Sequence, residues 1–260
     1  MQFRERYDIL KLLGRGSNAS VFLVRDKHLD KQWAAKIFDT THFRNRELLA
    51  VENEIRILKQ VQSLDLPRIV DLYRESHQIC LVMDYLQGVA LNTYVKTYGP
   101  VREYPAVCWM EELCGILSQL HHMEPPILYC DLKPENIILK NEGKLALIDL
   151  GSARVLDGNP GQMPALTGSS GYTAPELFQK QDQKPGTPET LTPGADIYSV
   201  GAVGAFLVTG MHPGHWAQMK DGFSRPFVQL VDKCLSERTV RIRDCETLKK
   251  EMKGWHGKYI

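Results

Sequence analysis

The spacing of apolar and polar positions divides the chain into a part that predicts strands and a part that predicts helices. In the first part, residues 9–13, 20–25 and 33–38 are rich in aliphatic or aromatic side chains and are separated by glycine or by charged residues. Short apolar runs with such boundaries are typical of strands joined by turns. The pattern predicts a small antiparallel sheet at the start of the chain.

Residues 43–62 have a different period. Their apolar positions recur at steps of three and four residues, at Leu48, Val51, Ile55, Leu58 and Val61. That spacing puts apolar side chains on one face of an α-helix. Residues 69–73 and 79–85, joined by a polar turn, predict two more strands, so the first part holds about five strands and one helix.

Beyond Gly88 the pattern turns helical. Residues 107–122 and 195–209 predict helices that end before Pro125-Pro126 and at Gly210, because proline and glycine terminate helices. A stretch rich in Gln, Pro, Thr and Lys, residues 179–193, predicts an exposed loop. We therefore expect an α+β chain with a β-rich first lobe, a connecting segment and a mainly α-helical second lobe, over residues 1–83, 84–88 and 89–260.

Composition places the chain among ordinary soluble globular proteins. Its 43% hydrophobic and 24% charged residues exclude the disordered, collagen-like and disulfide-scaffold classes. The net charge of +1 comes from nearly balanced positive and negative totals, which gives no sequence-independent attraction to nucleic acid or anionic lipid. We expect no nucleic-acid partner and no membrane contact within this chain, and any phosphate site must be local.

The cysteines and the N-terminus bear on compartment. No CxxC pair or metal-ligand spacing occurs among the six cysteines, Cys80, Cys108, Cys114, Cys130, Cys234 and Cys245, which favours reduced thiols in a cytosolic compartment. The N-terminus lacks the apolar core of a signal peptide, and the apolar run around residues 200–208 is too short to span a bilayer. We expect a cytoplasmic protein, or the cytoplasmic domain of a larger one whose sensor or anchor region lies outside this chain.

The segment Gly14-Arg15-Gly16-Ser17-Asn18-Ala19 is a candidate phosphate-binding turn between two predicted strands. Glycine permits a tight turn and lets the backbone approach a polyphosphate closely. In a dinucleotide fold such glycines open a helix, so that fold is disfavoured here. A hairpin with no ligand would leave the same residues, so the motif alone does not decide.

Lys36 is a candidate phosphate ligand in the middle of an apolar strand. Taken alone, it is explained as well by a solvated lysine on the outer face of the sheet. The helix that follows offers three glutamates that could hold it over nucleotide phosphates: Glu47, Glu52 and Glu54. We favour Glu54, because it lies on the apolar side of the predicted helix.

The most specific signal is the segment Tyr129-Cys130-Asp131-Leu132-Lys133-Pro134-Glu135-Asn136. It matches the protein kinase catalytic loop HRDLKPEN in six of eight positions. The chain thus resembles the eukaryotic-like protein serine/threonine kinases, and its Tyr-Cys-Asp loop is more similar to bacterial members than to animal ones. The resemblance implies that Asp131 orients and deprotonates the attacking hydroxyl, Lys133 neutralises the transferring phosphoryl group, and Asn136 binds a metal ion.

Later motifs extend the resemblance. The segment Ile148-Asp149-Leu150-Gly151 resembles the DFG motif with Leu for Phe, which implies that Asp149 binds magnesium. Ala174-Pro175-Glu176 matches the APE motif. Asp196 is similar to the aspartate that supports the catalytic-loop backbone, and Arg241 to the arginine that pairs with the APE glutamate.

The resemblance covers residues 13–248 and implies one protein kinase catalytic domain over residues 1–260, with ATP and Mg²⁺ as cofactors. It implies that Lys36, held by Glu54, contacts the α and β phosphates beneath the turn at Gly14 and Gly16. It implies an apolar adenine slot built from Leu13, Val21, Ala34 and Ile138. It also implies that Met83 is the gatekeeper and that the backbone from Asp84 to Leu86 meets the adenine.

Cys130 is the informative departure from the family pattern, because most members have arginine there. That arginine commonly receives a phosphate on the activation segment, and a cysteine offers neither positive charge nor paired donors. We therefore expect activity without phosphate-gated ordering of residues 149–176. Thr167, Ser169 and Ser170 are the candidate phosphorylation sites in that segment.

Three functions are weighed on these residues. The leading one is transfer of the γ-phosphoryl group of MgATP to Ser/Thr hydroxyls of proteins, including this protein itself. A nucleotide-binding pseudokinase scaffold is disfavoured because every residue implied to touch phosphate, metal or hydroxyl is present. A small-molecule kinase would share Asp131 and Asn136, but the APE motif argues against it. His121-His122 with Glu124 could suggest a metal site, yet adjacent histidines before Pro125-Pro126 are more typical of a helix C-terminal cap.

Overall fold

The computed structural model describes residues 2–16, 18–61, 65–156, 168–178 and 191–257. The chain forms two compact units, Met1–Gln87 and Gly88–Ile260. The division falls after Gln87, inside the connecting segment expected at residues 84–88.

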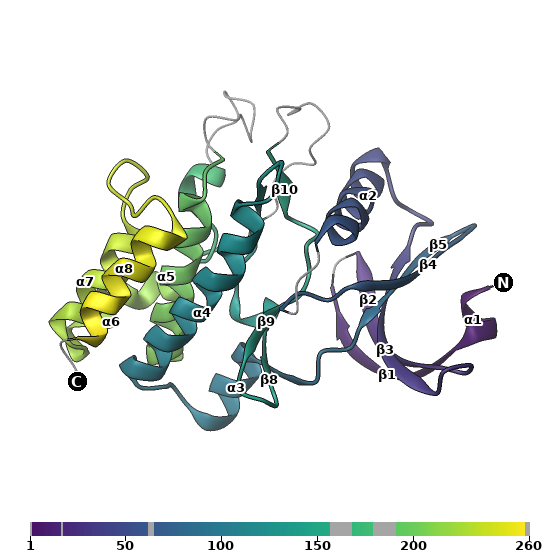
Figure 1. The fold of residues 1–260 in the computed structure, drawn as a ribbon, viewed down its shortest axis with the longest axis horizontal. Helices are drawn as coiled ribbons and strands as arrows, with labels where there is room; N and C mark the ends of the chain where they lie inside the picture. The colour runs from purple at the N-terminus through teal and green to yellow at the C-terminus, as the bar shows by residue number, and fades with distance from the viewer. Residues whose placement is uncertain (1, 17, 62–64, 157–167, 179–190, 258–260) are drawn as a thin grey trace. The chain divides into compact units, whose positions relative to one another are not determined.

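The first unit is built on a five-stranded antiparallel sheet of order β1-β2-β3-β5-β4. Its strands are β1 Tyr7–Arg15, β2 Ala19–Asp26, β3 Lys31–Asp39, β4 Ile69–Glu75 and β5 Gln78–Asp84. Its helices are α1 Phe3–Arg6 and α2 Asn45–Gln60 (Figure 1). The predicted sheet and helix are confirmed, although Leu48, the first residue of the predicted apolar face, is 37% exposed.

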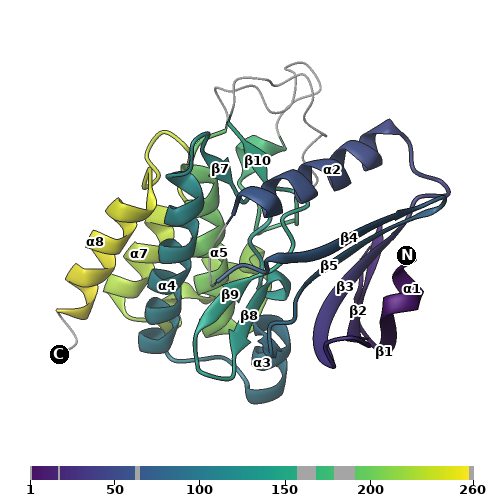
Figure 2. The ribbon, with the colours of Figure 1, turned by 45° about the vertical axis from the view of Figure 1, so that its right-hand side comes forward.

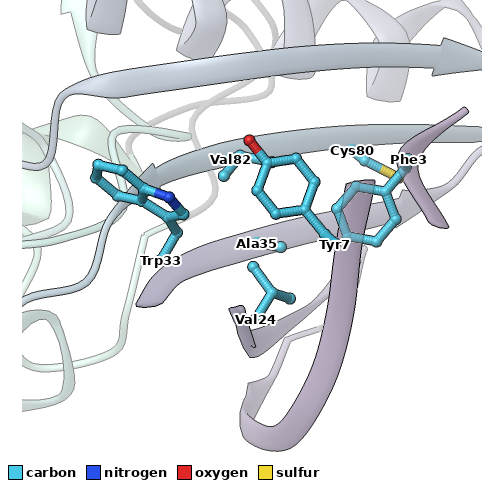
Figure 3. Close-up of a cluster of buried hydrophobic side chains, with 7 residues drawn as sticks. All are labelled: Phe3, Tyr7, Val24, Trp33, Ala35, Cys80 and Val82. Atoms are coloured by element: carbon cyan, nitrogen blue, oxygen red, sulfur yellow. The ribbon is translucent and has the colours of Figure 1, made fainter. Parts of the chain in front are cut away.

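One face of this sheet carries a buried apolar cluster of Phe3, Tyr7, Val24, Trp33, Ala35, Cys80 and Val82 (Figure 3). The β3 and β5 members are two residues apart along their strands, as expected when alternate side chains share a face. Because Trp33 and Ala35 occupy this face, Ala34 and Lys36 lie on the opposite one. The structure thereby decides which face of the sheet Lys36 occupies.

The second unit is mainly α-helical. Its helices are α3 Leu91–Tyr98, α4 Glu103–His121, α5 Gly194–Thr209, α6 Trp216–Met219, α7 Arg225–Leu235 and α8 Cys245–His256. Helix α4 packs against both α5 and α8 (Figures 1 and 2). The predicted helices are confirmed, and α4 begins four residues earlier than residue 107 because Pro105 is compatible with a first helical turn. Helix α5 is buried along nearly its whole length, which explains its almost uninterrupted apolar sequence.

Short strands frame the loops of the second unit. They are β6 Gly88–Ala90, β7 Ile127–Leu128, β8 Ile137–Lys140, β9 Leu145–Leu147 and β10 Arg154–Val155. Strands β6, β8 and β9 form one antiparallel sheet, and β7 pairs with β10. Short 3₁₀ turns are found at Pro134–Asn136, Pro175–Leu177, Pro213–His215 and Lys220–Gly222. The segment between β7 and β8 contains residues 129–136, and residue 149 follows β9 closely.

The expected loop and the expected lack of a membrane-spanning helix can be compared with the structure only over the described residues. The exposed loop expected at residues 179–193 lies outside them except for its last three residues, of which Leu191 is buried. Within the described part of the chain no single helix is long and apolar enough to cross a membrane. Only the bent pair Gly194–Thr209 with Pro213–Gly222 reaches the required length and apolar composition when the two are taken together.

Candidate active site

Lys36 in the first unit is paired with Glu54. The distance from Lys36 Nζ to Glu54 Oε1 is 2.6 Å, and Glu54 is 2% exposed. The two competing glutamates are engaged elsewhere, since Glu47 accepts the Arg44 backbone N–H at 3.0 Å and Glu52 accepts Arg74 Nη2 at 2.8 Å. A carboxylate this deeply buried is stable only with a charged or hydrogen-bonding partner. Of the three glutamates, Glu54 therefore holds the lysine.

Four of the residues expected at the nucleotide share the Lys36 face of the sheet. Val21 is paired with Lys36 across β2 and β3, and Ala34 is paired with Met83 across β3 and β5. Directly paired residues in antiparallel strands have side chains on the same face. The structure thus brings Val21, Ala34, Lys36 and Met83 to one surface, with Ala34 and Met83 each 8% exposed.

The glycine turn closes the hairpin between β1 and β2. Gly16 N–H donates to the Ala19 carbonyl at 2.8 Å. Among the described residues, a Cβ added at Gly14 would meet no atom within 4 Å, and one at Gly16 would meet only the Ala19 carbonyl oxygen at 3.6 Å. Neither glycine has a positive φ. The hairpin itself therefore does not require glycine at either position. This weighs against the alternative that the two glycines serve only a hairpin that binds no ligand.

The remaining expected nucleotide residues are distributed over both units. Leu13 is 38% exposed on β1, Leu86 is partly buried after β5, and Ile138 is partly buried on β8 of the second unit. The Asp84 carboxylate accepts Arg68 Nε at 2.8 Å, and its backbone N–H donates to the Arg68 carbonyl at 3.1 Å. Asp84 is thus fixed at the end of β5 by its own side chain.

In the second unit, Asp196 holds the backbone of the candidate catalytic loop. Its two carboxylate oxygens accept the Tyr129 N–H at 2.9 Å and the Cys130 N–H at 2.8 Å. The Tyr129 hydroxyl donates to the Ile148 carbonyl, which ties the loop to the end of β9. Cys130 has φ +64, a conformation that non-glycine residues rarely adopt without such support.

Asp131 is the centre of a polar cluster. Its Oδ2 accepts Lys133 Nζ at 2.8 Å, and its Oδ1 accepts the Ser169 hydroxyl at 2.8 Å. Asn136 Nδ2 donates to the Asp131 carbonyl at 3.0 Å and to Oδ2 at 3.2 Å. Burial raises the pKa of Asp131 above its ordinary value, although Lys133 and Ser169 act in the opposite direction. A carboxylate perturbed in this way by burial is typical of functional sites.

Asn136 and Asp149 offer oxygen atoms that suit a hard cation. The Asn136 amide nitrogen donates hydrogen bonds to Asp131. The amide oxygen of Asn136 is therefore the atom that a metal ion could bind. The Ile148 N–H donates to the Asn136 carbonyl at 2.9 Å, so the segments that carry the two residues are joined. Asp149 has φ +67. Within the described ranges no group of three His, Cys, Asp or Glu side chains could hold a metal alone, which suits Mg²⁺ bound jointly with substrate phosphates.

A comparison with known proteins decides the family. The sequence profile described as "Protein kinase domain" matches residues 7–254. The chain belongs to this family. It is 31% identical over 212 residues to the serine/threonine-protein kinase PrkC of Bacillus subtilis (strain 168), covering 80% of this chain and 31% of that protein. It is 28% identical over 214 residues to the calcium/calmodulin-dependent protein kinase type 1 of Caenorhabditis elegans, covering 81% of this chain and 58% of that protein.

The relatives of this kinase domain are diverse and longer. A probable myosin light chain kinase of Dictyostelium discoideum is 30% identical over 209 residues, covering 80% of this chain and 64% of that protein. The chain therefore spans between about a third and two thirds of the length of these three relatives. Because they come from a bacterium, an animal and a slime mould, the expected bacterial membership stays a prediction.

The kinase domain's APE segment is anchored as the family resemblance implied. Arg241 Nη1 and Nη2 donate to the two carboxylate oxygens of Glu176 at 2.5 and 3.0 Å, and Arg241 is 4% exposed. Paired bonds of this kind fix both distance and orientation. The segment before it is held by Thr173 Oγ1, which accepts the Ser169 N–H at 2.9 Å.

Sequence reasoning missed the position of His121. His122 is the C-terminal cap of α4, as expected, but His121 points into the unit and its Nε2 lies 2.8 Å from Asp196 Oδ2. It therefore supports the aspartate that holds the catalytic loop. Its partner lies 75 positions away in the sequence, so no local signal could have found it.

Proposed function

We propose that this kinase domain transfers the γ-phosphoryl group of MgATP to Ser/Thr hydroxyls of proteins, including its own. The observation that carries the proposal is that Asp131 Oδ2 accepts both Lys133 Nζ at 2.8 Å and Asn136 Nδ2 at 3.2 Å. In this assignment Asp131 orients the hydroxyl and accepts its proton, and Lys133 neutralises charge on the phosphoryl group. The Ser169 hydroxyl, donating to Asp131 at 2.8 Å, supports a carboxylate placed to accept a hydroxyl proton.

The nucleotide is assigned to the remaining residues by family position. Lys36, oriented by Glu54, would contact the α and β phosphates, and Asn136 and Asp149 would bind Mg²⁺. When bound, the metal would neutralise charge that develops on the phosphates. The glycines at positions 14 and 16, which the hairpin does not need, support a close approach of the backbone to phosphate. We also propose that the domain works in the cytoplasm.

The decisive experiment compares two aspartate substitutions. Asp131→Asn should lower transfer of radiolabelled phosphate from MgATP to a generic basic protein by about a hundredfold or more, because general-base catalysis is lost. Asp221→Asn, an exposed position in the same unit, is the matched control and should leave transfer unchanged. Transfer by Asp131→Asn at the rate of the unmodified protein would refute the assignment, and absence of transfer by the unmodified protein would favour a scaffold.

The finer proposal is that activity does not depend on a phosphate in the activation segment. Cys130 is 2% exposed and packs with Leu128, Ala174, Leu177, Leu191 and Ala195. Burial raises the pKa of its thiol well above the ordinary value, so the side chain stays neutral. A neutral group in an apolar cluster is a poor receptor for phosphate.

Removal of phosphate tests this finer proposal. Phosphatase-treated protein and the double variant Thr167→Ala, Ser170→Ala should keep the turnover of untreated protein. Ser169 is left unchanged because its hydroxyl contacts Asp131 and Lys133; Thr167 lies outside the described residues. Phosphosite mapping after incubation with MgATP measures self-phosphorylation in the same samples. Loss of activity on dephosphorylation, with recovery on rephosphorylation, would show that a phosphate switch operates.

A further inference from the structure

A tight turn of the second unit, residues 169–173, is held by a histidine that follows helix α5. Within this turn the Ser169 carbonyl accepts two backbone N–H groups, from the residues three and four positions later, at 3.1 and 3.0 Å. His212 Nε2 lies 2.9 Å from the carbonyl oxygen of Ser170, which is exposed in the middle of the turn. The two segments are 42 positions apart in the sequence, so this bond joins distant parts of the chain.

Both nitrogens of the His212 ring are used by backbone groups. The Gly214 N–H donates to Nδ1 at 3.1 Å, so Nδ1 carries no proton. Nε2 faces a carbonyl oxygen, which can only accept a hydrogen bond, so the proton of the ring is on Nε2. The ring therefore donates to the 169–173 turn with one nitrogen and caps the short 3₁₀ turn Pro213–His215 with the other.

Gly171 allows the 169–173 turn to approach this ring closely. Its φ is +78, a conformation that favours glycine, and a Cβ added there would lie 2.4 Å from His212 Cε1 and 2.7 Å from Nε2. The Tyr172 ring packs edge-on against the His212 ring, with centroids 5.9 Å apart, and against the Phe206 ring at 6.4 Å. A hydrogen bond, a close approach and ring contacts thus join the turn to the end of α5 and the segment after it.

The other end of the 169–173 turn lies at the proposed site of phosphoryl transfer. The Ser169 hydroxyl donates to Asp131 Oδ1 at 2.8 Å and accepts Lys133 Nζ at 2.9 Å. In the proposed function these two residues meet the acceptor hydroxyl and the transferring phosphoryl group. An acceptor serine or threonine must therefore lie beside Ser169, so the turn borders the protein substrate. This step rests on the proposed function.

We propose that His212 is a positioning residue for the protein substrate, because it fixes the 169–173 turn and thereby the surface beside the acceptor hydroxyl. Exposed turns are among the first segments of a protein to open locally, and a binding surface that must be ordered on binding loses affinity. A turn that His212 has already fixed avoids this loss. The nucleotide is assigned to other residues, so His212 should affect the affinity for the protein substrate and not the affinity for MgATP.

Two substitutions separate the roles of the two ring nitrogens. His212→Asn keeps an amide oxygen where Nδ1 accepts from Gly214 but is too short to reach Ser170, whereas His212→Gln places an amide nitrogen near the position of Nε2. With histone as the protein substrate, His212→Ala and His212→Asn should raise the KM for histone about fivefold, the usual size of one hydrogen bond. His212→Gln should restore most of the affinity. The KM for MgATP should be the same in all three.

His215→Ala is the matched control and should leave both KM values unchanged. His215 is exposed and its ring lies 6.5 Å from that of His212, but among the hydrogen bonds of the described residues none joins its side chain to the 169–173 turn. A second measurement needs no activity. The peptide that carries Tyr172 and Thr173 should exchange its amide hydrogens about fivefold faster in His212→Ala and His212→Asn than in the unmodified chain, because these two N–H groups close the turn.

A double substitution tests the close contact between Gly171 and His212. Gly171→Ala should raise the KM for histone more in the unmodified chain than in a chain that already carries His212→Ala, because the added Cβ then no longer meets the ring. Equal effects in the two backgrounds would show that the contact does not couple the turn to the histidine.

Other results would also overturn the proposal. An unchanged KM for histone in His212→Asn would show that the bond to Ser170 does nothing for the substrate. An equal rise in the KM for MgATP, or no recovery in His212→Gln, would indicate a general structural role of the ring instead. Absence of phosphate transfer by the unmodified chain would refute the proposed function, whereas unchanged hydrogen exchange in His212→Ala would refute the positioning role by itself.

Discussion

Asp26 shows how one buried charge stabilises the first unit. The carboxylate is fully buried; Oδ2 accepts Arg6 Nε at 3.0 Å and Nη2 at 2.8 Å, and Oδ1 accepts the His28 and Leu29 N–H groups at 2.8 and 3.1 Å. Burial alone would raise the pKa of Asp26, but Arg6 and the two backbone donors lower it below its ordinary value. A lowered pKa in the folded state stabilises the fold above the ordinary carboxyl pKa of about 3.9.

We therefore predict that Asp26→Asn lowers the free energy of unfolding at pH 7 by about 2 kcal/mol, the usual value of a hydrogen bond to a charged group. The difference from the unmodified protein should shrink as pH falls through the lowered pKa of Asp26, because protonation then removes the charge that the Asn variant already lacks. Urea denaturation followed by circular dichroism at pH 7 and pH 3 measures it. Asp30→Asn, with a side chain 87% exposed, is the control and should change little; an equal loss at both pH values would contradict the explanation.

At the level of single residues, local motifs were predictable and distant contacts were not. Asp131, Lys133 and Asn136 lie within one run of six residues, so their shared chemistry could be recognised from the sequence. Cys245 lies 124 positions from the histidine that it contacts. Such a contact depends on how α8 packs against α4, which no local pattern encodes.

At the level of elements, the helices and strands that could be predicted are those whose burial gives the sequence a recognisable apolar pattern. Helix α2 buries one face and therefore has a clear period, whereas strand β5 is buried at five consecutive positions and was recognisable as a short apolar run. Helix α1 has four residues and no period; it is stabilised by packing, with the Phe3 ring 5.4 Å from the Tyr7 ring and 5.8 Å from the Tyr73 ring. Strands of two or three residues, such as β7 and β10, are too short to give any alternation.

The glycine at the end of α5 illustrates a local signal that was sufficient. Gly210 has φ +68 and its N–H donates to the Phe206 carbonyl at 2.7 Å, which is the left-handed cap that favours glycine. Helix α5 gives almost no amphipathic period because it is buried on all sides. Its end was still predictable, since the cap depends on backbone conformation rather than on packing.

At the level of the whole molecule, binding of MgATP and transfer of phosphate should be separable by substitution. The unmodified chain should gain thermal stability with MgATP, by about 2.7 kcal/mol when the ligand is at a hundred times its dissociation constant. Asp131→Asn should keep most of this gain, because its carboxylate is assigned to the substrate hydroxyl. Asp149→Asn should lose the part that depends on magnesium, because its carboxylate is assigned to the metal.

Differential scanning fluorimetry with ATP, in magnesium and in excess chelator, measures these gains, and phosphate transfer is assayed on the same samples. Magnesium without ATP should give no gain, since no cluster within the described residues could hold the ion alone. If Asp149→Asn responded to MgATP as the unmodified chain does, the metal assignment would be wrong. A gain in the unmodified chain without any transfer would mean that the domain binds nucleotide as a scaffold, since nucleotide binding stabilises a fold whether or not the γ-phosphoryl group ever leaves.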